Sequence, residues 1–146
     1  MESLDDKDLK IIEILQEHGD YATRDIAKEA HLPITTVHNR IQRLKAQGII
    51  RKFTIDVHPE VLNKGFMAYV LISVNLEHLK QVHKTQHDIA QELSAFDFIQ
   101  RADVIAGGTD IIAVIQVKDV KEFNQVLLTK VQQIAGIKET KSMIVV

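Results

Sequence analysis

Apolar side chains recur every three or four residues in two short segments near the start of the chain, which predicts two helices. The first is expected between Asp5, a favourable N-cap residue, and Gly19. Its inner positions are Leu9, Ile12 and Leu15, backed by Ile11 and Ile14. The second covers 23–30 and is expected to be capped by Thr23. Its narrow inner stripe consists of Ile26, Ala27 and Ala30.

A third helix is expected over 34–47, between Pro33, which suits a helix start, and Gly48, which suits a helix end. Its inner stripe is Val37, Ile41 and Leu44. At about 100° per residue, the opposite face carries Thr35, Asn39 and Gln42, with Thr36, His38 and Arg43 beside them. Two short helices joined by a tight break, the second with a polar outer face, indicate a helix-turn-helix over 23–42.

The outer face of this third helix carries side chains suited to reading base edges in a DNA major groove. Asn and Gln can bind adenine through two hydrogen bonds, Arg can bind guanine likewise, and Thr offers a hydroxyl and a methyl group. The expected phosphate contacts are Arg40, Lys45, Arg51 and Lys52. The pattern alone is equally compatible with a three-helix bundle whose polar face is exposed to solvent.

The second half of the chain shows apolar runs of a different kind. Phe53, Ile55 and Val57 alternate within 49–57, which predicts a half-buried strand, and the Pro, Asn and Gly of 58–65 mark a linker. Further strands are expected over 66–76, 96–106, 109–117 and 137–146, with helices over 78–93 and 119–135.

The order of these elements predicts an α+β protein with two domains. A winged-helix-like helix-turn-helix domain is expected in 1–57, followed by a ferredoxin-like βαββαβ domain in 66–146. Its strands are rich in Val, Ile and Leu, so the sheet face without helices needs cover, which we expect a second copy of the chain to supply. A symmetric dimer would also present two DNA-reading helices to two half-sites.

Charge is distributed unevenly along the 146 residues, although the net charge is only −2. Residues 1–29 contain nine acidic and four basic residues, whereas residues 30–52 contain five basic residues and no acidic one. The total charge argues against nucleic-acid binding, but the basic segment coincides with the third helix and favours it.

Composition and motifs exclude several other classes of protein. Without cysteine, neither a disulfide framework nor a thiolate metal site can form, and neither a secretory signal nor a stretch of about 18 apolar residues is present. A cytoplasmic protein without membrane association is therefore expected. His83 and His87 have i, i+4 spacing but lack the Glu of an HExxH motif, and no nucleophile-elbow, dinucleotide or P-loop motif occurs. We expect no metal site, no cofactor and no catalytic residues.

Together these segments resemble the Lrp/AsnC (feast/famine) transcriptional regulators over nearly the whole chain. The run LDDKDLKIIEILQEHG resembles their first helix, TRDIAKEAHLPITTVHNRIQ their helix-turn-helix, and RIQRLKAQGIIRKF the run that closes it. The resemblance implies a C-terminal domain that dimerises, often assembles into octamers and in many members binds an amino acid at contacts between dimers. We expect the assembly to bind palindromic promoter sites on double-stranded DNA. The transcription machinery is a possible further partner, but no motif marks a surface for it. The recognition positions that it implies are Thr35, Thr36, His38, Asn39, Arg40, Gln42 and Arg43.

The sequence departs from the family pattern at two turns. His31 stands where the family usually has Gly, so His31 must adopt a left-handed conformation or the turn must differ. The sequence GGTD resembles the family's Gly-x-Tyr/Phe-Asp turn, with a threonine in the aromatic position. The candidate effector contacts there are Gly107, Gly108, Thr109 and Asp110. Closure of a hairpin is the alternative role for this turn.

Two other functions are compatible with the same architecture. Sirohaem decarboxylases resemble it, so an enzyme is one alternative, and a structural oligomer with a vestigial N-terminal domain is another. An enzyme would have no need of outward-facing Thr35, Asn39, Gln42 and Arg43 beside basic residues. It would also bind a tetrapyrrole, which gives an experimental means of distinguishing it.

Overall fold

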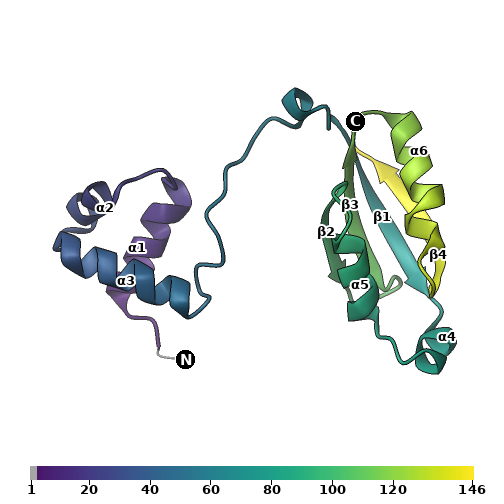
Figure 1. Cartoon of the computed structure of the whole chain (residues 1–146), viewed down its shortest axis with the longest axis horizontal. Helices are drawn as coiled ribbons and strands as arrows, with labels where there is room; N and C mark the ends of the chain where they lie inside the picture. Colours follow the sequence, from purple (N-terminus) through teal and green to yellow (C-terminus); the bar gives the residue numbers. More distant parts are fainter. Residues whose placement is uncertain (1–2) are drawn as a thin grey trace. The chain divides into compact units, whose positions relative to one another are not determined.

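A computed structural model describes residues 3–146, and the chain divides into two compact units, Met1–Asp56 and Val57–Val146. The first unit contains the helices α1 (Asp6–Glu17), α2 (Thr23–Ala30) and α3 (Ile34–Ala46) (Figure 1). Its buried core consists of Ile11, Ile14, Ile26, Ala27 and Val37. Three short amphipathic helices thus enclose one small apolar cluster, as the hydrophobic periodicity predicts.

The inner face of α1 differs from the prediction. Asp8, Ile11 and Ile14 are buried, whereas Leu9 is exposed. The predicted stripe that includes Leu9 was therefore wrong, because apolar residues cover most of this helix and its packing against α2 and α3 selects which face turns inward. The predicted N-cap is confirmed, since the Asp5 side chain accepts a hydrogen bond from the Asp8 backbone N–H at 2.9 Å.

The turn between α2 and α3 contains both special features that the sequence indicates. His31 adopts the left-handed conformation (φ 54°, ψ 43°) and ends α2. Pro33 precedes α3 as its N-cap residue. Thr23 does not cap α2, contrary to expectation, because the Ala22 carbonyl accepts the first hydrogen bonds of the helix, from Asp25 N and Ile26 N.

The second unit is built on a four-stranded antiparallel sheet with the order β2-β3-β1-β4. Its strands are β1 (Phe66–Val74), β2 (Ile99–Val104), β3 (Ile111–Val117) and β4 (Ile137–Ile144). The short helix η1 (Pro59–Leu62) precedes β1. The remaining helices are α4 (Leu76–Gln81), α5 (Gln86–Ser94), α6 (Val120–Thr129) and η2 (Val131–Gln133). This topology confirms the predicted ferredoxin-like arrangement and the α+β class.

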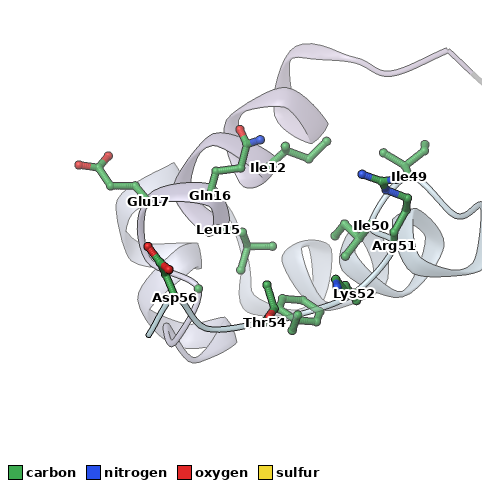
Figure 2. A pocket seen from close by; sticks show the side chains of 12 residues that line it. Ile12, Leu15, Gln16, Glu17, Ile49, Ile50, Arg51, Lys52, Thr54 and Asp56 are labelled. Carbon is green, nitrogen blue, oxygen red and sulfur yellow. The ribbon is translucent and has the colours of Figure 1, made fainter. Parts of the chain in front are cut away.

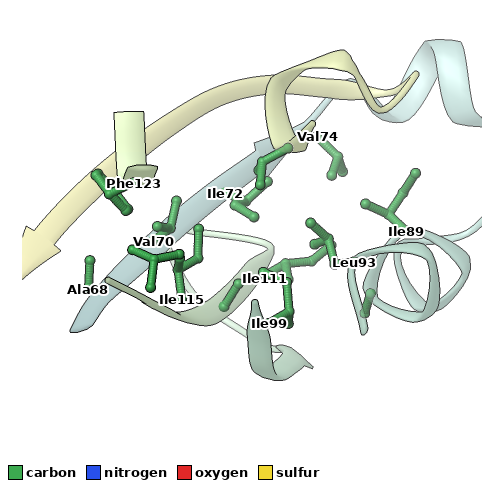
Figure 3. Close-up of a cluster of buried hydrophobic side chains, with 14 of the residues drawn as sticks. Ala68, Val70, Ile72, Val74, Ile89, Leu93, Ile99, Ile111, Ile115 and Phe123 are labelled. Carbon is green, nitrogen blue, oxygen red and sulfur yellow. The ribbon is translucent and has the colours of Figure 1, made fainter. Parts of the chain in front are cut away.

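One face of the sheet is packed against helices and forms the core of the unit (Figure 3). Alternate residues of β1 and β3, such as Val70, Ile72 and Ile115, contact side chains from the helices, such as Leu93 and Phe123. The residues that alternate with these buried ones along each strand lie on the opposite face of the sheet. Its side chains on the paired strands include Met67, Tyr69, Leu71, Ile112, Val114 and Met143.

Two predicted elements differ in the structure. The helix expected over 78–93 is interrupted, because Asn75 caps α4 while Thr85 and Asp88 form a capping box that starts α5. The strand expected over 49–57 was wrong: residues 51–58 are not in a strand, and Ile55 is 82% exposed. A strand needs a neighbour for its backbone hydrogen bonds, and no described residue supplies one to this segment.

Candidate nucleic-acid interface

The outer face of α3 is polar and open to solvent. Val37 and Leu44 are completely buried on the inner side of the helix. The predicted base-reading residues Thr35, His38, Asn39 and Gln42 are all exposed, while Thr36 is half-buried. These exposed side chains offer amide, hydroxyl and imidazole groups, which can bind base edges in a major groove.

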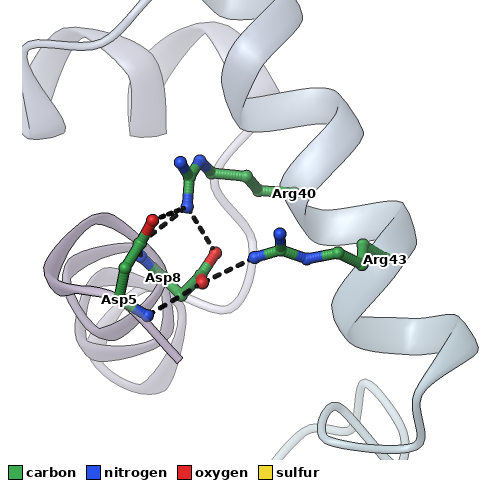
Figure 4. Close-up of polar contacts among 4 residues, drawn as sticks. All are labelled: Asp5, Asp8, Arg40 and Arg43. Atoms are coloured by element: carbon green, nitrogen blue, oxygen red, sulfur yellow. Dashed lines mark hydrogen bonds and ion pairs between the residues drawn. The ribbon is translucent and has the colours of Figure 1, made fainter. Parts of the chain in front are cut away.

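Arg40 and Arg43 are directed toward the start of α1 (Figure 4). The Nη1 atom of Arg40 donates hydrogen bonds to both carboxylate oxygens of Asp5, at 2.7 and 2.8 Å, and to Oδ1 of Asp8 at 2.8 Å. The Nη2 atom of Arg43 donates to Oδ2 of Asp8 at 2.6 Å. Asp8 is only 1% exposed, so one buried carboxylate connects both arginines of α3 to α1.

These contacts alter the pKa values of two of the four groups, Asp5 and Arg40. The hydrogen bond from the Arg40 guanidinium, together with the backbone hydrogen bond from Asp8, lowers the pKa of Asp5 from 3.8 to about 2. Hydrogen bonds to Asp5 and Asp8 in turn raise the pKa of Arg40. Both groups are therefore charged near neutral pH, and each stabilises the charge of the other.

This geometry differs from the roles expected of the two arginines. Arg40 is predicted to bind phosphate and Arg43 to read a base, yet in this structure both guanidinium groups bind carboxylates from the start of α1 or from its N-cap residue. From the sequence, Asp5 is assigned only as a helix cap and Asp8 only as an acidic residue of the first turn, and neither is identified as a partner of the two arginines. The available signal was the spacing of Asp8, Ile11 and Ile14, which places an acidic residue in line with the buried positions of α1.

The other predicted phosphate contacts lie at the end of α3 and just after it. Lys45, Arg51 and Lys52 are exposed, and the Lys45 ammonium lies 5.9 Å from the centre of the Phe53 ring. Arg51 and Lys52 also line an open groove of about 920 Å³ within the first unit, between α1 and residues 49–56 (Figure 2). The remaining lining residues are Ile12, Leu15, Gln16, Glu17, Gly19, Ile49, Ile50, Phe53, Thr54 and Asp56.

The glycine-rich turn of the second unit closes the hairpin between β2 and β3. Gly107 has a φ of 140°, while Gly108 and Thr109 continue the turn. The carboxylate of Asp110 accepts hydrogen bonds from Val74 N at 2.9 Å and from Gln86 Nε2 at 2.8 Å. The turn is thereby connected to the end of β1 and the start of α5.

The predicted histidine pair does not share a helix. His83 has a φ of 54° and lies between α4 and α5, whereas His87 lies within α5. Among the residues that the structure describes, no group of three or more His, Cys, Asp or Glu is placed to hold a metal ion. None of the helices described in residues 3–146 is both long enough and apolar enough to span a bilayer.

Two protein families match separate parts of the chain. Residues 4–51 match the winged helix-turn-helix DNA-binding family. Residues 67–146 match the Lrp/AsnC ligand-binding domain. The first match contains all three helices of the first unit, and the second contains the sheet except for Phe66.

Individual relatives match over nearly the whole chain. The HTH-type transcriptional regulator FL11 of Pyrococcus furiosus is 37% identical over 142 residues, which are 97% of this chain and 89% of that protein. A transcriptional regulator of Neisseria meningitidis, solved as a complex with L-Met, has a TM-score of 0.85 at 22% identity and covers 99% of this chain and 90% of that one. AsnC of E. coli has a TM-score of 0.81 at 24% identity, with coverage of 99% and 93%. These solved structures have the same fold.

Proposed function

The chain belongs to the Lrp/AsnC family of transcriptional regulators, and we propose that it binds palindromic promoter sites as a homodimer or as an assembly of dimers. The α3 helix of each copy would enter successive major grooves, about one helical turn of DNA apart or more. The transcription machinery is then the further partner on which the bound assembly acts. The alternative of a sirohaem-decarboxylase-like enzyme gains no support from the comparisons.

The observation that carries this proposal is the exposed polar face of α3. Thr35, Asn39 and Gln42 project from the side opposite the buried Val37 and Leu44, so they are available to base edges. The cationic side chains at the C-terminal end of α3 and beyond it would bind the phosphate backbone of the DNA. Such contacts orient the helix but do not read the DNA sequence. Base recognition therefore rests mainly on amide and hydroxyl groups.

Selection of binding sites from a random DNA pool, combined with the mass of the protein in the same buffer, tests this proposal. We expect an enriched palindrome and an even-numbered oligomer. Asn39→Ala should reduce discrimination at particular base pairs, whereas Lys45→Ala should weaken binding to all sequences alike. If no sequence is enriched at low salt, or if both variants affect selected and random DNA equally, the proposed division of roles is wrong.

We propose that the open face of the sheet in the second unit is the dimer interface. Tyr69 and Leu71 of β1 lie on this face opposite Val114 and Ile112 of β3, and Met143 of β4 continues the apolar surface. Apolar side chains on adjacent strands form one patch, and burying such a patch against a second copy removes it from water.

Leu71→Asp would place a charge in the middle of this apolar face, so we expect it to dissociate the dimer. Leu128→Asp is the matched control, because Leu128 is an exposed leucine of α6 and does not lie on the sheet. Sedimentation of both variants gives the result. Equal masses for the two variants would argue against this interface.

We propose that an amino acid modulates the assembly by binding near the turn formed by residues 107–110. The match to a ligand-binding domain and the L-Met complex of the Neisseria relative motivate this proposal. An effector can act only by binding one assembly state more tightly than another. Titration with each of the twenty amino acids should show heat for at least one, with a change in mass or DNA affinity; no response to any of them would contradict the proposal.

A further inference from the structure

Asp5 and Asp8 both bind Arg40, but they do so in different surroundings. Asp8 is buried and bridges Arg40 and Arg43. The Asp5 side chain is 52% exposed, and its two oxygens lie 2.7 and 2.8 Å from Nη1 of Arg40. The Arg40 side chain itself is 19% exposed. The contact with Asp5 therefore lies at the surface, where another anion can replace it, while the contact with Asp8 lies in the interior.

The contact between Asp5 and Arg40 has the same chemistry as a contact between arginine and a DNA phosphate. Carboxylate and phosphate oxygens both accept charge-assisted hydrogen bonds from a guanidinium group. Arg40 lies on α3 directly after Asn39, which is exposed on the outer face of the helix. The low pKa of Asp5 keeps its carboxylate charged at the pH of a binding assay.

We propose that Asp5 competes with a DNA phosphate for Arg40 and so limits the affinity of the protein for DNA of any sequence. The inference rests on the proposed role of α3 as the helix that enters the groove. Without the Asp5 carboxylate, a phosphate can bind Nη1 of Arg40 in its place while Asp8 still accepts a hydrogen bond from the same atom, so Arg40 does not have to leave the α1 side of the helix. Asp5 thus lowers the affinity for DNA by occupying Arg40.

Asp5→Asn isolates this competition from the other task of Asp5. The Asp5 side chain also caps α1, and asparagine is an equally favourable N-cap residue, so the variant loses the carboxylate and keeps the cap. Asp6→Asn is the matched control, because Asp6 is the next residue, is also exposed and carries the same charge. Both variants change the net charge equally, so the difference between them reports the contact with Arg40.

The test measures the affinity for a DNA duplex of random sequence at several salt concentrations. Each additional phosphate contact makes the slope of log affinity against log salt steeper by about 0.9. We expect this increase for Asp5→Asn and no change for Asp6→Asn. Between 50 and 200 mM salt, the advantage of Asp5→Asn over the natural protein should shrink roughly three- to fourfold. The double variant Asp5→Asn/Arg40→Gln should return the slope to its natural value.

The possible results separate this inference from the proposed function. If the natural protein binds no DNA, the proposed function is wrong. If the natural protein binds DNA but Asp5→Asn has the same salt slope as Asp6→Asn, Asp5 does not compete with phosphate for Arg40. The same conclusion follows if Asp5→Asn binds DNA more weakly than the natural protein. Circular dichroism checks the fold of each variant. Asp5→Ser, which also retains a capping side chain, replaces Asp5→Asn if that variant does not fold.

Discussion

Neutralising the buried carboxylate of Asp8 should destabilise the first unit. Asp8→Asn keeps the size of the side chain but removes the charge that Arg40 and Arg43 bind, at 2.8 and 2.6 Å. The amide retains an oxygen for only part of these contacts and brings two donors of its own. One of those donors would face a guanidinium group, which can accept no hydrogen bond.

The expected magnitude follows from the burial of the three groups. Removing one partner of a buried ion pair costs about 3–5 kcal/mol when the other charge stays uncompensated in the interior. The Arg40 and Arg43 side chains are 19% and 37% exposed, so water still hydrates part of their charge. We therefore expect a loss of about 2–3 kcal/mol. In a unit of this size, that loss lowers the unfolding midpoint by roughly 10–20 °C.

Thermal unfolding of the full chain, followed through the NMR amide signals of α1 and α3, measures this loss. The amide signals of β1 and β3 serve as an internal reference, because these strands belong to the other unit. Glu13→Gln is the matched control, since the Glu13 side chain is 70% exposed and its neutralisation should cost less than about 0.5 kcal/mol. A midpoint for Asp8→Asn within a few degrees of that for Glu13→Gln would refute the reasoning.

Other positions give equally direct tests. Gly136→Ala should destabilise the second unit by roughly 2–4 kcal/mol, because φ is 106° and a new Cβ would lie 2.5 Å from Cδ2 of Leu79. Gly108→Ala is the control: its new Cβ would meet no atom within 4 Å, so the unfolding midpoint should change little. The pKa of Asp5 is about 2 in the folded protein and 3.8 otherwise, so its ion pair should stabilise the protein above about pH 4 and stop doing so as the pH falls toward 2. An NMR titration of the Asp5 carboxyl with a midpoint near 4 would contradict that prediction. His31→Gly should raise the stability of the first unit by about 0.5–1 kcal/mol, because glycine adopts the left-handed conformation without strain; urea unfolding that shows no gain would argue otherwise.

Local patterns in the sequence predict most of the fold. The N-cap at Asp5, the break at His31 and the inner stripe of α3 all depend on neighbouring residues, and the structure contains each of them. The break before α5 also had a local signal, since Thr85 and Asp88 have the spacing of a capping box. Because apolar residues recur at helical spacing throughout 78–93, the pattern predicts one continuous helix there in spite of the capping box.

The features that the sequence does not reveal depend on distant residues. Arg40 and Arg43 lie 32 and 35 residues from Asp8, and a helical projection shows which face they occupy but not which group they bind. In the same way, the alternation of Phe53 and Ile55 describes a segment that could be a strand. Whether it becomes one depends on a neighbouring strand, which cannot be read from the segment itself.

The hydrogen bonds of Asp110 have a consequence for any ligand that carries an amino group. Both carboxylate oxygens already accept donors of the chain, one from Val74 and one from Gln86. An ammonium group that displaced either donor would form a charge-assisted hydrogen bond but leave that donor without its partner, so part of the gain in free energy would be offset. Its larger effect would be mechanical, because the displaced donor belongs to the end of β1 or to the start of α5. A ligand that binds at this turn would therefore loosen one of the two elements that the turn holds together.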